Sequence, residues 1–199
     1  MQSEARSKRE AQIAAAAYAM IEEKGYAGAS MLSIAKKAKA SNETLYNWYG
    51  DKLGLFKSLI SRNTDEVRAI LEKSVQEEVP PLKALEIVSP VLLNMLLGER
   101  AIALNRAASA DPSGKLGETL AEAGRNTVLP LIGNLLKAAK KDGLIAYERL
   151  PDALNTYSSL LVGDLQIRRA TGALPPLKEA EIKKRAKLAI AQFMKLYGS

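Results

Sequence analysis

Residues 30–56 read SMLSIAKKAKASNETLYNWYGDKLGLF, and this stretch decides the fold of the N-terminal part of the chain. Apolar residues recur at helical spacing in two short segments, 31–37 and 42–49, and a serine precedes each segment. Serine hydroxyls accept hydrogen bonds from the first backbone N–H groups of a helix, so Ser30 and Ser41 are expected to cap these helices. Asp51 stands in the same relation to a third helix that starts at Lys52. The stretch predicts a short helix, a tight turn, a second short helix and the start of another.

The second of these helices has a surface suited to nucleic acid. A helix-turn-helix places its second helix in the major groove of DNA, with the N-terminal residues of that helix against base edges. The two predicted helices can pack through apolar residues at suitable spacing, namely Ile34, Ala35, Ala38, Leu45 and Tyr49. The outer face of the second helix then carries groups that reach bases or phosphates, namely Asn42, Thr44, Tyr46, Asn47 and Trp48. The sequence therefore predicts a helix-turn-helix that binds DNA.

Residues 34–56 resemble the signature of the TetR/AcrR family of transcriptional regulators, and the preceding residues 25–35, GYAGASMLSIA, resemble it too. The likeness extends over residues 6–60. It implies a DNA-binding repressor that acts as a homodimer on a palindromic operator in double-stranded DNA. It also implies phosphate contacts for Tyr46, Trp48 and Lys52, whereas Asn42, Thr44 and Asn47 would read the base sequence. The full set of DNA-binding residues expected from the resemblance is Ser30, Met31, Ser41, Asn42, Glu43, Thr44, Tyr46, Asn47, Trp48 and Lys52.

Three residues depart from the family pattern. Lys39 stands in the turn where the family usually has glycine, at a position that often needs a positive φ. Ala40 replaces the usual valine and should pack less well. Glu43 replaces a glycine or alanine near the start of the recognition helix, where phosphates repel a carboxylate unless it accepts a hydrogen bond from the N4 amino group of a cytosine. Glu43 is therefore either a residue that sets base specificity or one that faces solvent.

Helical spacing continues through the rest of the chain, and no segment alternates apolar and polar residues as a half-buried strand does. A first helix is expected from Glu4 to about Lys24, where Gly25 ends it. Ser89-Pro90 either kinks or restarts a helix, and Pro130 is a candidate kink in another. Long helices are expected over residues 151–171 and 178–197. The sequence predicts an all-α protein of about nine or ten helices, with Arg168 and Arg169 on a solvated helix face.

The helices divide into two expected domains. Residues 1–54 form a three-helix helix-turn-helix DNA-binding domain, and residues 55–199 form a larger domain for effector binding and dimerisation. A small-molecule effector is expected among the middle helices, where apolar residues and a few polar groups could form a pocket. The candidate pocket residues are Leu92, Met95, Asn105, Ile132, Leu136 and Tyr157. The candidate dimer-interface residues, on the last two long helices, are Leu160, Leu161, Asp164, Ile190 and Phe193.

The chain of 199 residues contains neither histidine nor cysteine, and this excludes several classes of function. Zinc fingers, iron–sulfur proteins and catalysis by Ser–His–Asp or Cys–His groups all need one of these residues. We expect no metal, no cofactor and no enzymatic activity, and an effector recognised by shape and apolar contact. A small helical enzyme or ligand-binding protein is an alternative, with Glu118 and Glu122 as its main acidic pair. A helical regulator that acts through protein contacts is another.

The net charge of +7 is unevenly distributed along the chain. Residues 1–60 carry nine bases and six acids, residues 61–177 carry fourteen of each, and residues 178–199 carry six bases and two acids. An excess of bases near the recognition motif suits phosphate contacts. The apolar runs are shorter than the roughly 20 residues of a membrane span, and no secretory signal is evident. A cytoplasmic protein without membrane association is expected.

Overall fold

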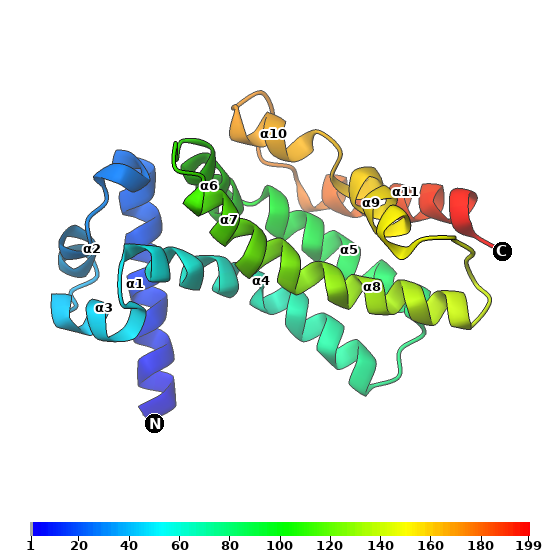
Figure 1. Cartoon of the computed structure of the whole chain (residues 1–199), viewed down its shortest axis with the longest axis horizontal. Helices are drawn as coiled ribbons and strands as arrows, with labels where there is room; N and C mark the ends of the chain where they lie inside the picture. The colour runs from blue at the N-terminus through cyan, green and yellow to red at the C-terminus, as the bar shows by residue number, and fades with distance from the viewer. Residues whose placement is uncertain (1) are drawn as a thin grey trace. The chain divides into compact units, whose positions relative to one another are not determined.

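The computed structural model describes residues 2–199, with side chains from Glu4 onward, and its regular elements are helices (Figure 1). Within this range the only β pairing is an isolated bridge between Ile145 and Gly198. The predicted all-α fold is therefore confirmed. The elements are α1 (Gln2–Gly28), α2 (Met31–Lys37), α3 (Asn42–Tyr49), α4 (Lys52–Gln76), α5 (Pro81–Leu97), α6 (Glu99–Ser109), α7 (Lys115–Leu120), the π-helical turn η1 (Ala121–Arg125), α8 (Asn126–Lys141), α9 (Leu150–Val162), α10 (Leu165–Ala170) and α11 (Glu179–Tyr197).

The chain forms two compact units, and each unit is built from two separate stretches of the sequence. Unit 1 comprises the chain up to Arg62 together with Ala103–Leu120, and unit 2 comprises Asn63–Ile102 together with Ala121–Ser199. Two of the passages between the units lie inside helices α4 and α6. The predicted functional boundary between residues 54 and 55 stays a prediction.

Helix α1 holds unit 1 together through its apolar face. Ile13 and Ala17 are completely buried, and Met20 and Ile21 are nearly so, at the spacing of one helical stripe. Gly25 leaves the helical conformation, with φ 68° and ψ 168°, which divides α1 where its end was predicted. The single turn that follows leads to Ser30 and α2.

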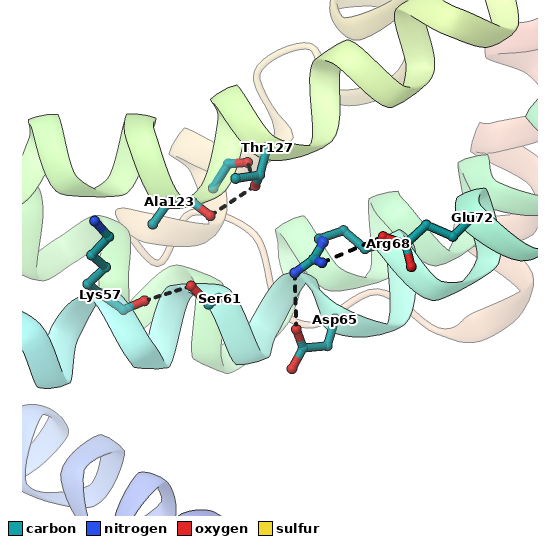
Figure 2. A network of polar contacts seen from close by, with 8 residues as sticks. Lys57, Ser61, Asp65, Arg68, Glu72, Ala123 and Thr127 are labelled. Atoms are coloured by element: carbon teal, nitrogen blue, oxygen red, sulfur yellow. Dashed lines mark hydrogen bonds and ion pairs between the residues drawn. The ribbon is translucent and has the colours of Figure 1, made fainter. Parts of the chain in front are cut away.

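Helix α4 begins with a side-chain cap and carries ion pairs on its outer face. A carboxylate oxygen of Asp51 accepts a hydrogen bond from the backbone N–H of Gly54 at 2.7 Å, as the sequence predicts for a cap. Further along, Arg68 lies 3.7 Å from Asp65 and 3.6 Å from Glu72 (Figure 2). These pairs are exposed, so each contributes little to stability.

The core of unit 2 is built by α5, α8, α9 and α11, which pack against one another (Figure 1). Tyr157 of α9 meets Phe193 of α11 edge-on, with ring centroids 6.1 Å apart. The buried Tyr157 hydroxyl is hydrogen-bonded to the hydroxyl of Ser89 at 2.8 Å, and the Ser89 hydroxyl also lies 2.6 Å from the Leu85 carbonyl. Because both hydroxyls have partners, the polar pair is accommodated in an apolar interior.

Two helices tolerate an internal proline in different ways. Helix α5 runs unbroken through Pro90, so the predicted restart is absent. Helix α8 contains Pro130 and is preceded by η1. The hydroxyl of Thr127, in the first turn of α8, donates a hydrogen bond to the Ala123 carbonyl of η1 at 3.0 Å (Figure 2). Such π-turns insert one extra residue into a helix and re-aim the segments on either side.

The predicted single helix over residues 151–171 is wrong, because the chain breaks at Gly163 into α9 and α10. Gly163 has φ 53° and ψ −132°, a conformation that side-chain-bearing residues rarely adopt. Arg185 of α11 donates its Nε–H to the carbonyl of Leu161 at 3.1 Å, which satisfies one of the last carbonyls of α9. Gly163 therefore marks the end of α9.

Among residues 2–199, no single helix has the length and apolar composition needed to cross a membrane. The pair α5 and α6, bent by 53°, passes that test when the two are taken together, as the buried helices of a folded core also do.

Candidate nucleic-acid interface

The start of α2 is fixed by a reciprocal pair of serines. The hydroxyl of Ser30 accepts a hydrogen bond from the Ser33 backbone N–H at 3.1 Å, and the Ser33 hydroxyl accepts one from the Ser30 N–H at 3.0 Å. This is a capping box, so the predicted cap is confirmed. Met31 is buried, so its side chain is a packing residue and only its backbone is available to a ligand.

The turn between α2 and α3 has a left-handed residue at its centre. Lys39 has φ 52°, so the positive φ predicted at this departure from the family pattern is confirmed. The Ala40 N–H donates to the Ala35 carbonyl at 3.0 Å and the Lys39 N–H donates to the Lys36 carbonyl at 3.2 Å. These two bonds form a Schellman motif, which usually has glycine where this chain has Lys39.

Helix α3 begins at Ser41 and is anchored by one apolar residue. The Ser41 hydroxyl accepts a hydrogen bond from the Thr44 N–H at 3.0 Å and lies 2.7 Å from the Thr44 hydroxyl. Leu45 is completely buried, which fixes the face of the helix that turns inward. The Thr44 hydroxyl is therefore engaged with Ser41 in this structure, although the sequence assigns it to base reading.

The opposite face of α3 is free to meet a ligand. Asn42, Glu43 and Asn47 are exposed, and the Tyr46 side chain is 48% exposed. Among the described residues, no hydrogen bond or ion pair engages the side chains of Asn42, Glu43 and Asn47. Four of the predicted DNA-binding residues thus share one accessible surface, which has amide, carboxylate and phenol groups to offer to base edges and phosphates.

Trp48 and Lys52, both expected to hold phosphates, make contacts with α1. The guanidinium of Arg6 lies over the Trp48 ring, 5.2 Å from its centroid. The Lys52 ammonium donates to the Ala27 carbonyl at 3.2 Å and lies 4.2 Å above the Tyr26 ring, while burial lowers the pKa of this lysine. One ammonium N–H is thereby engaged, and the side chain remains only partly accessible.

Gly54 is a residue of this region that the sequence reading missed. A Cβ atom placed on it would lie 1.9 Å from the carbonyl oxygen of Tyr49, the last residue of α3. Only glycine allows the first turn of α4 to approach the end of α3 this closely. The sequence signal was available, since Gly54 interrupts the predicted helix two residues after its start.

The predicted effector residues do not form one group. Leu92, Ile132, Leu136 and Tyr157 lie in the core of unit 2, and Met95 packs against that core. Asn105 belongs instead to unit 1. Burial raises the pKa of the Tyr157 hydroxyl far above its ordinary value, so this group is a neutral hydrogen-bonding group at any physiological pH.

The predicted dimer residues also differ in accessibility. Leu161 and Phe193 are completely buried within the protomer, where they pack in the core of unit 2, so their side chains are not available to a partner. Leu160 and Ile190 are half-buried, and Asp164 is exposed. Further exposed apolar residues on α10 and α11 are Ile167, Leu188 and Leu196.

Arg169 is not on a solvated helix face, and that expectation is corrected. The side chain is buried, and it donates to the carbonyl oxygens of Leu97 and Leu174, each at 3.1 Å, and to the Glu99 carboxylate at 2.6 Å. It therefore ties α10 to the corner between α5 and α6 within unit 2. Its neighbour Arg168 is exposed and lies 3.8 Å from Asp164.

Two family profiles match the chain. The profile described as bacterial regulatory proteins of the tetR family matches residues 13–59, and the one described as the C-terminal domain of AefR-like transcriptional repressors matches residues 83–199. A comparison with curated proteins gave no significant match.

Solved structures resemble the chain over nearly its whole length. A TetR-family regulator of Mesorhizobium loti is 25% identical, with 97% of this chain and 98% of that chain covered and a TM-score of 0.77. A TetR regulator of Agrobacterium tumefaciens is 26% identical, with coverage of 96% and 95% and a TM-score of 0.75. FadR from Bacillus subtilis, solved in complex with stearoyl-CoA, is 18% identical, with coverage of 90% and 97% and a TM-score of 0.69, which is a likeness of fold.

Proposed function

Because the chain belongs to the TetR family of transcriptional regulators, we propose that it represses transcription by binding a palindromic operator as a homodimer, and that a small effector releases it. The observation that carries the proposal is the exposed face of α3, where Asn42, Glu43, Tyr46 and Asn47 lie on a helix that its own cap and Leu45 hold in place. The description of the matching C-terminal family as repressors supports the direction of regulation. Such a protein acts in the cytoplasm, where the DNA is.

The proposal is tested by selecting an operator from random duplex DNA with the full-length protein and then measuring its affinity at several salt concentrations. We expect a palindromic site, because dimers place two recognition helices in successive major grooves. The logarithm of affinity should fall linearly with the logarithm of salt concentration as phosphate contacts release counterions. Selection of no sequence, together with no retardation of DNA at low salt, would favour a regulator that acts through protein contacts.

Glu43 provides a finer test of the same surface. Its exposed carboxylate has no partner among the described residues, and it lies in the first turn of α3, where the residues of a recognition helix meet base edges. If Glu43 accepts a hydrogen bond from cytosine N4, Glu43→Ala should relax the preference at one base pair by about 1–3 kcal/mol. An unchanged base preference at every position would mean that Glu43 faces solvent.

Dimerisation is assigned to α9, α10 and α11, with residues 1–54 as the DNA-binding domain and 55–199 as the effector and dimerisation domain. Leu160, Asp164 and Ile190 retain accessible surface on these helices, and the exposed Leu188 and Leu196 extend the apolar surface of α11. Light scattering of the full chain at micromolar concentration should give the mass of a dimer. The mass of a monomer would overturn this part of the proposal.

The effector is assigned to unit 2 and to the apolar or amphipathic class. The core of this unit is packed with aliphatic and aromatic side chains such as Leu92, Ile132 and Leu136, with the Ser89–Tyr157 hydroxyl pair among them. FadR from Bacillus subtilis, which shares the fold, holds stearoyl-CoA, so a long-chain acyl-CoA and the free fatty acid are suitable first probes. Release of the selected operator by a probe would support the class. Polar probes that release it when both lipids fail would contradict it.

A further inference from the structure

Three polar residues of α1 reach across the helix-turn-helix. Arg9 donates a hydrogen bond to the carbonyl oxygen of Lys39, at the centre of the turn between α2 and α3, with a distance of 3.1 Å. Arg6 lies over the ring of Trp48 on α3 at 5.2 Å from its centroid. Glu10 pairs with Arg6 at 3.1 Å and with Arg62 of α4 at 3.5 Å. We call Arg6, Arg9 and Glu10 the α1 clamp.

The clamp contacts both ends of the recognition element. The Lys39 carbonyl lies just before α3, and Trp48 is next to its last residue. Leu45 is the one completely buried side chain of α3, so it fixes which face of the helix turns inward, and a small rocking of α3 would pivot about it. Contacts before the start and near the end of the helix oppose such rocking.

We propose that Arg6 and Arg9 are positioning residues for base recognition, and that they act through the turn and Trp48 instead of binding phosphates. This inference rests on the proposed DNA-binding function. Arg6 directs its charge at Trp48 and Glu10, and Arg9 directs its charge at a backbone carbonyl, so both cations already have partners inside unit 1.

The two roles have different consequences for DNA binding. A lost phosphate contact weakens binding to every sequence and lowers the salt slope by about 0.9 for each contact in double-stranded DNA. A recognition helix that rocks keeps its phosphate contacts but loses the fixed geometry on which base contacts depend. Loss of the clamp should therefore reduce the discrimination between operator and unrelated DNA while the salt slope stays the same.

The test uses the full-length double variant Arg6→Met/Arg9→Met, which keeps an unbranched apolar stem at both positions and removes both guanidinium groups. Its charge-matched control is Lys8→Met/Lys24→Met, since Lys8 and Lys24 are exposed on the same helix and make no hydrogen bond or ion pair with the residues that the structure describes. Affinities for the selected operator and for an unrelated duplex are measured by fluorescence anisotropy at several salt concentrations. The variant Arg6→Lys/Arg9→Lys tests for rescue, because lysine keeps both the cation over the ring and a donor for the carbonyl.

Trp48 gives a readout that needs no DNA, because it is the only tryptophan in the chain. Without the Arg6 guanidinium over its ring, Trp48 should become more accessible to the neutral quencher acrylamide. The quenching constant should rise in Arg6→Met/Arg9→Met and remain at the wild-type value in the control Lys8→Met/Lys24→Met.

The expected result is a three- to tenfold loss of the affinity ratio between operator and unrelated duplex, which is less than one surface cation–π contact and one charged hydrogen bond contribute together, because only part of that free energy acts on the geometry of base recognition. The affinity ratio should stay at the wild-type value in the control Lys8→Met/Lys24→Met. It should also return to that value in Arg6→Lys/Arg9→Lys. A salt slope lower by about 3.6, as for two lost phosphate contacts in each subunit of the dimer, would overturn the proposal, as would an unchanged ratio. If the wild-type protein selects no operator, the proposed function itself fails, which is a different result from an operator bound with an unchanged ratio.

Discussion

Lys39 and Glu78 adopt the same left-handed conformation, with φ 52° and 51°, at the ends of α2 and α4. Glu78, like Lys39, lies in a Schellman motif: the Val79 N–H donates to the Ser74 carbonyl at 2.9 Å, and the Glu78 N–H donates to the Val75 carbonyl at 3.3 Å. The left-handed region costs a residue with a side chain about 1–2 kcal/mol, whereas glycine enters it freely.

Lys39→Gly should therefore stabilise the protein by about 0.5–1 kcal/mol, because relief of the strained backbone exceeds the entropy that glycine loses on folding. The melting temperature should rise by roughly 1–4 °C for a chain of this size. Glu78→Gly is the matched variant, and it should gain at least as much because it also removes a negative charge from a helix C-terminus. A lower melting temperature in both variants would contradict this account of the turns.

Gly54→Ala should have the opposite effect. The added methyl group would meet the Tyr49 carbonyl at 1.9 Å, and a backbone oxygen in a capped junction cannot move aside cheaply. We expect a loss of at least about 2 kcal/mol in thermal or urea unfolding. The control is Gly117→Ala inside α7, where a Cβ meets nothing within 4 Å and alanine favours the helix by about 1 kcal/mol. Equal stability of the two variants would argue against the close approach.

At the scale of the element, the beginning of α7 depends on one carboxylate. Asp111 accepts hydrogen bonds from the backbone N–H of Leu116 at 2.9 Å and from the Ser113 hydroxyl, and these bonds hold its pKa below the ordinary 3.8. A lowered pKa means that the carboxylate stabilises the fold at pH values above the unfolded pKa. This contribution disappears as the pH falls through the folded pKa.

The difference in melting temperature between wild type and Asp111→Asn should thus be constant near neutral pH and shrink below about pH 4. Ser113→Ala should keep part of the pH dependence, because the bond from Leu116 remains. A difference that grows on acidification would contradict the assigned cause.

Arg169 fixes α10 in place. Arg169→Met should cost about 2–3 kcal/mol, because it leaves the carbonyls of Leu97 and Leu174 without their charged donor. Arg168→Met, at the adjacent exposed position, should change stability by no more than about 0.5 kcal/mol. Urea unfolding of the two variants checks this, and similar losses for both would show that the buried contacts contribute little.

The contrast between these two arginines shows what the sequence can and cannot predict at this scale. The caps at Ser30 and Ser41 depend on neighbours three residues away, so local pattern was sufficient to place α2 and α3. The partners of Arg169 lie in α6 and at the end of α5, far along the chain, and an Arg-Arg pair carries no local sign of which member is buried. The break at Gly163 was missed because apolar residues continue at helical spacing on both sides of it.

At the scale of the whole molecule, the positive charge of the chain is divided between the two units. The bases near the recognition motif belong to unit 1, whereas α11, with its run of lysines, belongs to unit 2 and packs on α5 and α9. The all-α class followed from periodicity throughout the chain. The assembly of each unit from two separate stretches of the chain could not be predicted in this way, since it depends on contacts between residues distant in sequence.

Lys184→Gln/Lys187→Gln, on the exposed face of α11, should therefore leave both the operator affinity and the salt slope unchanged. Fluorescence anisotropy with the selected operator at several salt concentrations measures both quantities. A slope lower by about 3.6, which corresponds to two lost contacts in each subunit of the dimer, would mean that these lysines bind phosphates. A matching loss of melting temperature would instead identify a structural effect of the variant.

The segment 103–120 changes how this protein can be recombined with its relatives. Unit 1 is not a continuous stretch of sequence, because Leu104, Ala107 and Leu116 are buried in a segment that follows residues 63–102 of the other unit. A chimera that receives only residues 1–62 from a relative would combine the helices of the relative with residues 103–120 of this protein. The buried side chains of the two parts would then not be matched to each other. A functional exchange of DNA specificity is therefore expected to require either residues 103–120 from the same donor or a graft restricted to the exposed residues of α3.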